Sequence, residues 1–209
     1  MKTLYGIIKK SREKGKMEMN KLLEKNKLVY AIFLLYTLNA LIVVLSAWAI
    51  NLHRFELNLT ISHYIGLRRW TAFMYVIVAG SMAALATVHV IKIKMSVFKK
   101  ILYILAFLCV FGCAVCPMNR GWNNTVSDIH HIFAHTLMYN GAITFIWMLI
   151  KPINTAQRVF AIVAIGYTIL FIATLVITSV KFLSDTLFIW ENALIYLFII
   201  EMALEKNKE

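Results

Sequence analysis

Three ionisable residues, Asp128, His131 and His135, lie at the start of a long apolar stretch of the sequence. Positions i, i+3 and i+7 lie along one side of an α-helix, so the three side chains are expected on one helix face. Two histidines four residues apart can bind one Zn²⁺ ion, and an aspartate can add an oxygen ligand. A zinc ion with an open coordination position would activate water for hydrolysis. The alternative is a buried hydrogen-bond network that ties helices together, because ionisable groups inside a bilayer usually face the protein interior.

The composition places these residues in a membrane protein. Of the 209 residues, 61% are hydrophobic and 15% are charged, whereas a soluble domain is roughly half apolar. The mean hydropathy is +0.73. A formal net charge of +12 would suggest nucleic-acid binding in a soluble protein, but in a membrane protein the position of each charge matters more than the total. We therefore expect membrane lipids as partners, with a protein partner in the membrane as a further candidate and no nucleic acid.

Six apolar runs are long enough to be membrane spans. A helix needs about 20 residues to cross the hydrocarbon layer, so the third run, which is short, is expected to extend to about Pro117. The predicted fold is an all-α, polytopic bundle of six transmembrane helices. The predicted spans are residues 28–50, 70–91, 101–116, 129–150, 159–180 and 186–204.

Lysine and arginine residues orient this predicted bundle. Seventeen of them lie in the segments on one side of the spans and five on the other, and basic residues are enriched on the cytoplasmic side. Both termini are therefore expected in the cytoplasm, in a multi-pass protein of the cell (plasma) membrane. The chain divides into a basic segment, residues 1–27, a transmembrane domain, residues 28–205, and a short tail, residues 206–209. The basic segment is either an amphipathic helix on anionic lipid or a solvated flank that fixes the topology.

Further polar residues lie within or beside the spans. With this topology, His135 in the fourth span and Glu191 in the sixth are expected at a similar depth in the outer leaflet. A glutamate there needs a partner or a proton, and His135 is a candidate partner if the two spans are adjacent. Ser81 lies within the second span. Arg68 and Arg69, at the start of that span, either bind a lipid phosphate or a carboxylate or extend to the membrane surface.

Two cysteines form a second candidate motif, Cys113-Ala-Val-Cys116, followed by Pro117. Their spacing matches that of thiol–disulfide motifs. Redox enzymes of this kind need a second cysteine pair, and the remaining cysteine, Cys109, lies one turn deeper in the same predicted helix. The alternative is that these are small apolar side chains packed within a span.

Several short segments resemble a six-helix family called domain of unknown function 998, which is related to the superfamily of DRAM-like autophagy modulators. The resemblance covers nearly the whole chain after Lys27, and its motifs are short. Two positions depart from the family pattern: Cys116 stands where phenylalanine is usual, and the arginine of the family's sixth helix has no clear counterpart. The matching segments are Thr60-Ile-Ser62-His-Tyr-Ile-Gly66 with Trp70, Phe73 through Gly80-Ser81, Gly112 through Pro117-Met-Asn119, Asp128-Ile-His130-His131, and Asp185 through Trp190-Glu191.

The resemblance implies six helices, an outward-facing polar pocket and an association with lipids, and it implies no established reaction. The hypothesis that follows is a non-enzymatic membrane protein that binds a lipid, a small amphiphile or a partner through an outer-leaflet pocket without a cofactor. Its candidate ligand-binding residues are Asp128, His131, His135, Glu191, Arg68, Arg69 and Ser81.

Two alternatives stay open. The first is a zinc-dependent hydrolase that acts on a lipid, with Asp128, His131 and His135 as metal ligands. It rests on an analogy with alkaline ceramidases, whose zinc site has a serine, an aspartate and three histidines. Ser81 and the three metal-ligand candidates are similar in type. The second alternative is a small transporter or a subunit of a membrane complex, with Glu191 and the histidines as titrating groups.

Overall fold

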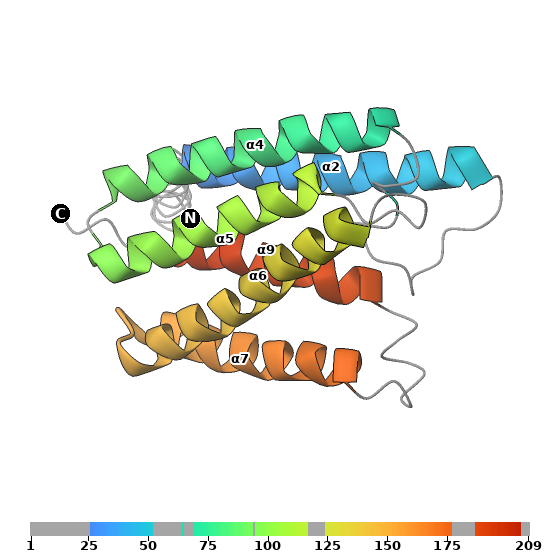
Figure 1. Ribbon diagram of the computed structural model, residues 1–209. Helices are drawn as coiled ribbons and strands as arrows, with labels where there is room; N and C mark the ends of the chain where they lie inside the picture. Colours follow the sequence, from blue (N-terminus) through green and yellow to red (C-terminus); the bar gives the residue numbers. More distant parts are fainter. Residues whose placement is uncertain are drawn as a thin grey trace, which may run out of the picture.

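The computed structural model describes residues 26–51, 64, 69–93, 95–116, 124–176 and 187–205, and these residues are almost entirely α-helical. The prediction of an all-α fold with six helices is confirmed for this part of the chain (Figure 1). The predicted basic segment up to residue 25 and the tail from residue 206 lie outside the described residues. The helices are α2 (Lys27–Asn51), α4 (Arg69–Lys92), α5 (Val97–Val115), α6 (Asn124–Ile150), α7 (Thr155–Val176) and α9 (Leu187–Leu204).

Consecutive helices run in opposite directions along the bundle (Figure 1). The starts of α2, α5 and α7 therefore lie at the same end as the ends of α4, α6 and α9. We call this end, at the left of Figure 1, the Lys99 end, and the opposite end the His130 end. Each helix contacts the next one, and α9 contacts α2, α6 and α7. Thus α9 closes the six described helices into a ring.

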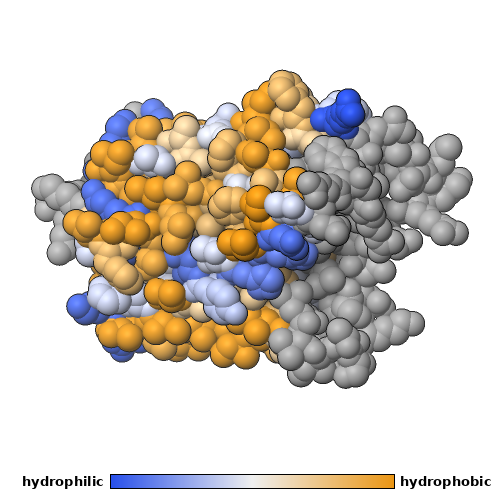
Figure 2. Space-filling model, in the orientation of Figure 1, coloured by the Kyte–Doolittle hydropathy of each residue, from blue (hydrophilic) through white to orange (hydrophobic). Residues whose placement is uncertain are grey.

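The face of the bundle seen in Figure 2 is mostly apolar over its described residues. Large apolar side chains are exposed along the bundle, such as Leu45 (61% exposed), Phe73 (64%) and Ile132 (64%). A water-soluble protein rarely exposes so much contiguous apolar surface, whereas lipid solvates it. Of the described helices, the five from α2 to α7 are long and apolar enough to cross a membrane. The protein is therefore a multi-pass membrane protein.

The described helices match the predicted spans to within a few residues, with three larger differences, all at helix starts. One is α7, which begins at Thr155, four residues before the predicted start. The third helix gains its length at its start rather than toward Pro117, since it runs from Val97 to Val115 with Ser96 as its N-cap. The apolar pattern excluded Lys99 from this span, but ion pairs allow it to be buried inside the bundle. The fourth helix begins at Asn124, five residues before the predicted start.

Small residues let neighbouring helices approach closely. Gly112 of α5 faces Phe133 of α6, and a Cβ atom at this glycine would lie 2.6 Å from the phenylalanine ring. A Cβ atom at Gly141 of α6 would lie 3.4 Å from side chains of α9. Close packing at small residues is a main source of helix association in membranes. These contacts hold α5, α6 and α9 together around the polar residues described below.

Candidate functional site

The three residues of the predicted metal site, Asp128, His131 and His135, all lie on the exposed side of α6. The ring centroids of the two histidines are 6.1 Å apart. The Nδ1 atom of His135 donates a hydrogen bond to the carbonyl oxygen of His131 at 2.7 Å. Among the described residues, no group of three His, Cys, Asp or Glu side chains is placed to hold a metal ion. The zinc site stays a prediction.

A different histidine, His130, points into the protein and is 2% exposed. Its Nδ1 atom lies 2.7 Å from the carbonyl oxygen of Cys116 and 3.3 Å from that of Cys113. An imidazole N–H that donates to these carbonyls ties the start of α6 to the end of α5, where the last carbonyls of a helix lack intrahelical partners. Sequence analysis missed this role. The available signal was that His130 shares the helix face of Leu137 and Gly141.

The three cysteines, two within α5 and Cys116 directly after its end, are free thiols. Cys109 is buried within the helix packing, and Cys113 and Cys116 are half-buried. The Sγ atom of Cys113 lies 4.0 Å from the carbonyl oxygen of His130. This environment is that of small side chains packed between helices, and the redox interpretation stays untested.

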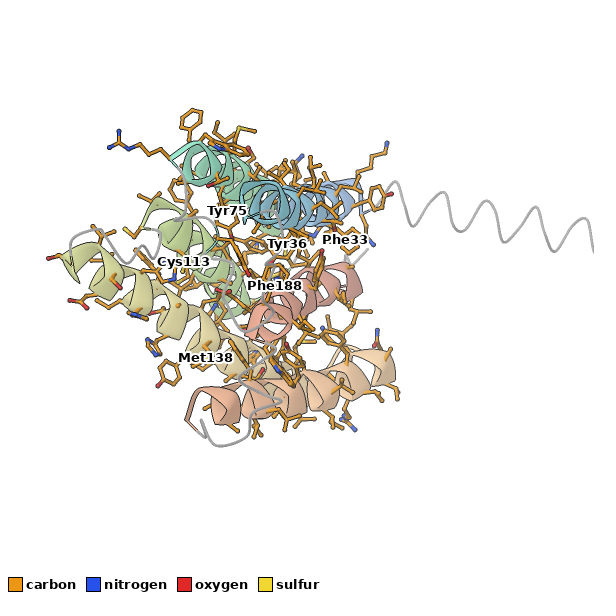
Figure 3. All side chains as sticks on the ribbon, turned by 90° about the vertical axis from the view of Figure 1, so that its right-hand side faces the viewer. Phe33, Tyr36, Tyr75, Cys113, Met138 and Phe188 are labelled. Atoms are coloured by element: carbon orange, nitrogen blue, oxygen red, sulfur yellow. The ribbon has the colours of Figure 1, made fainter. Side chains whose placement is uncertain are left out.

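Glu191 lies among polar side chains from three other helices. It is close enough to Tyr36 of α2, Tyr75 of α4 and Cys113 of α5 to interact electrostatically with each. The hydroxyl of Tyr36 donates a hydrogen bond to Oδ1 of Asn192 at 2.8 Å. Figure 3 shows the side chains of Tyr36, Tyr75 and Cys113 directed into one interior region. We call these five residues the Glu191 cluster.

An aromatic pair lies beside the Glu191 cluster. Tyr64, from the segment between α2 and α4, is 3% exposed. Its ring meets that of Phe188 of α9 edge-on, with the centroids 6.2 Å apart. The labelled Phe188 is close to the cluster in Figure 3. The pair therefore covers the start of α9, next to Glu191.

The remaining predicted ligand-binding residues are not gathered with the Glu191 cluster. The side chain of Arg69 is exposed at the start of α4. The hydroxyl of Ser81 donates a hydrogen bond to the carbonyl oxygen of Ile77 in its own helix at 2.8 Å. Arg68 lies outside the described residues.

A second polar cluster lies at the Lys99 end, and sequence analysis missed it. The side chain of Lys99 is only 7% exposed, and its Nζ atom lies 3.1 Å from Oε1 of Glu201. It is also ion-paired with Glu205. Gln157 donates a hydrogen bond from Nε2 to Oε1 of Glu205 at 2.8 Å. Its own Oε1 atom accepts a hydrogen bond from the backbone N–H of Ile153 at 2.7 Å.

This arrangement, which we call the Lys99 cluster, joins α5, α7 and α9 through buried charges. Glu201 is fully buried, and a charge inside a membrane protein must be compensated by a partner. The cluster has its own sequence signal, because two glutamates four residues apart at the end of a span lie on one helix face. Beside it is a cleft lined in part by lysines.

Comparison of the chain with protein-family models, with curated proteins and with solved structures gave no match. The resemblance to the six-helix family therefore stays a prediction from short motifs. The function has to be argued from the two polar clusters and from the membrane-spanning bundle that holds them.

Proposed function

We propose that this is a non-enzymatic membrane protein that binds the polar head of a lipid or a small amphiphile at the Glu191 cluster. The observation that carries this proposal is the gathering of a carboxylate, two tyrosines, an amide and a thiol from four helices inside an apolar bundle. Polar groups are costly within a membrane, and those that persist there usually line a ligand or ion site. The cluster offers hydrogen-bond donors and acceptors, and the apolar side chains around it would contact the rest of an amphiphile.

The orientation is part of the proposal. We infer that α9 crosses the membrane as a sixth span, because it runs antiparallel to α2 and α7, which it contacts, along the bundle (Figure 1). The Lys99 end would face the cytoplasm, since most lysines and arginines belong to the segments at this end. The Glu191 cluster would then lie in the outer half of the membrane, where a lipid of that leaflet can reach it.

The proposal is tested by lipid analysis of the protein purified in a mild detergent. We expect a co-purifying amphiphile that is bound by the wild type and lost in Glu191→Gln, a substitution that keeps the side chain's size and removes its charge. Asp128→Asn is the matched control, because it removes a carboxylate from the same end of the bundle on the exposed face of α6.

Retention of the amphiphile in Glu191→Gln with loss in Asp128→Asn would contradict the proposal. That result would move the binding site to the histidine face. No bound amphiphile in the wild type would also contradict it.

The zinc-dependent hydrolase is the second candidate. It is favoured by the proximity of the imidazoles of His131 and His135, which share one face of α6. Two histidines would supply half of a tetrahedral zinc site. Further ligands would have to come from Asp128, from outside the described residues or from a second molecule.

A further inference from the structure

A cleft of about 690 Å³ opens at the Lys99 end, at the opposite end of the bundle from the Glu191 cluster. We propose that it binds the phosphate headgroup of an anionic phospholipid, whose acyl chains lie along the outer faces of α5 and α6. The cleft lies between the α4–α5 connection and the α6–α7 connection, where helices end and headgroups begin. This proposal does not rest on ligand binding at Glu191.

Four lysines from three places in the chain line the cleft. They are Lys92 at the end of α4, Lys99 and Lys100 in the first turn of α5, and Lys151 just after α6. The Lys99 charge is compensated by Glu205, which also lines the cleft, and by Glu201 behind it. Four lysines against two glutamates leave an excess of two positive charges.

The other three lysines are available to an anion. Within the described part of the chain, neither Lys92, Lys100 nor Lys151 is ion-paired with a carboxylate. Two of them are held at the cleft by weaker contacts: Lys100 Nζ donates to the carbonyl oxygen of Ile91 at 3.2 Å, and Lys151 Nζ lies 4.7 Å from the ring centroid of Trp147. Ammonium groups on three separate elements can surround one phosphate.

The start of α5 adds to this positive field. Ser96 lines the cleft and is the N-cap of this helix of 19 residues. The first N–H groups of a helix and its dipole both favour a negative charge nearby. The helix start and the three lysines therefore act on the same volume.

The apolar walls favour a lipid over free phosphate. Isoleucines, a methionine and Trp147 share the lining with the lysines. Phe98 packs against Trp147 with the ring centroids 4.8 Å apart, and tryptophan is typical of the membrane interface. Val97, Ile101 and Ile150, next to the cleft along the bundle, are 73%, 56% and 66% exposed. A molecule with a phosphate head and apolar chains fits both the lysines of the cleft and the exposed apolar side chains beside it. Inorganic phosphate fits only the lysines.

The test measures lipid binding to the full chain in detergent by native mass spectrometry. The probes are phosphatidic acid, which has a phosphomonoester head, and phosphatidylcholine, which has no net charge. Each basic residue near a membrane surface strengthens the binding of an anionic lipid about fivefold. Removing two of them should therefore weaken phosphatidic acid binding about thirtyfold. We therefore expect about thirtyfold weaker phosphatidic acid binding in the double variant Lys100→Gln/Lys151→Gln. Phosphatidylcholine should bind weakly to the wild type and to every variant.

Lys27→Gln/Arg158→Gln is the matched control. It removes two charges from the same end of the bundle, at residues that do not line the cleft, and we expect wild-type affinity. The charge-conserving variant Lys100→Arg/Lys151→Arg should bind as the wild type does and shows that the folded state is kept. Equal losses in both glutamine variants would overturn the proposal, because they would indicate general attraction by charge. Displacement of phosphatidic acid by an equal concentration of inorganic phosphate would also overturn it, because the site would then recognise phosphate alone.

Discussion

The substitution Lys99→Met removes the cation that compensates two buried carboxylates. The side chains of Glu201 and Glu205 are 0% and 2% exposed, so water has little access to replace the lost ammonium group, least of all at Glu201. Removing one partner of a buried ion pair costs about 3–5 kcal/mol, because the remaining charge stays buried and unpaired. We expect the free energy of unfolding to fall by that amount. Methionine keeps the length and the apolar part of the side chain, so the loss reports the charge.

The assay is unfolding of the purified protein by denaturant or heat in a fixed detergent. Lys92→Met is the control, because Lys92 is exposed at the same end of the bundle and should change the free energy of unfolding by only about 0.5 kcal/mol. The triple variant Lys99→Met/Glu201→Gln/Glu205→Gln should recover most of the stability, because neutral groups can often replace a whole buried ion pair at little cost. A Lys99→Met variant that is as stable as Lys92→Met would refute this reasoning. A triple variant less stable than Lys99→Met would also refute it, since the carboxylates would then do more than balance the lysine.

Three further predictions test the packing and the histidines. Gly112→Ala should lower the free energy of unfolding by about 1–3 kcal/mol, because the new methyl group would collide with a phenylalanine ring of α6. The control Gly166→Ala meets no atom within 4 Å and should not destabilise the protein. Equal effects of the two variants in a melting assay would contradict the close approach of α5 and α6. His130→Ala should lower the free energy of unfolding by about 1–3 kcal/mol through lost hydrogen bonds, and His131→Ala should lower it much less. If His131→Ala were the more destabilising variant, the assignment of His130 to the buried face of α6 would be contradicted. Metal analysis of the purified protein should give far less than one zinc ion per chain, unchanged in His131→Ala/His135→Ala; one zinc per wild-type chain that is lost in this variant would establish the metal site instead.

The helices could be predicted from the sequence because the bilayer sets their length. Each apolar run has to cover the same hydrocarbon thickness, so its position follows from hydropathy alone. The error at the start of α5 has a local cause. Hydropathy predicts a loop at Lys99 and Lys100, because it counts each charge without its partner. In the structure, Lys99 is buried inside the bundle with Glu201 and Glu205. Pairing between helices is a tertiary property that a single run of sequence does not contain.

The interior polar residues were harder to identify for the same reason. The spacing of Asp128, His131 and His135 correctly predicts that they share one face of α6, but spacing does not say whether that face is inside. Neighbouring helices decide this, and they bury His130 instead. Glu191 was identified as a candidate because a carboxylate within a span is unusual. The tyrosines around it lie in other helices, so sequence analysis could not assign them to it.

The last helix depends on all the others, and this predicts which part of the fold loosens first. α9 carries Glu191 toward the His130 end and Glu201 at the Lys99 end, and an isolated helix with such charges is costly in lipid. Its partners come from α2, α4, α5 and α7, so α9 gains them only when those helices have assembled. We therefore expect Lys99→Met to increase hydrogen exchange in α9 while the pair α4 and α5 stays protected, because that pair packs through small and apolar side chains such as Gly80 against Phe111. An equal increase in α9 and in α4 would contradict this order and would indicate that the ring opens as a single unit.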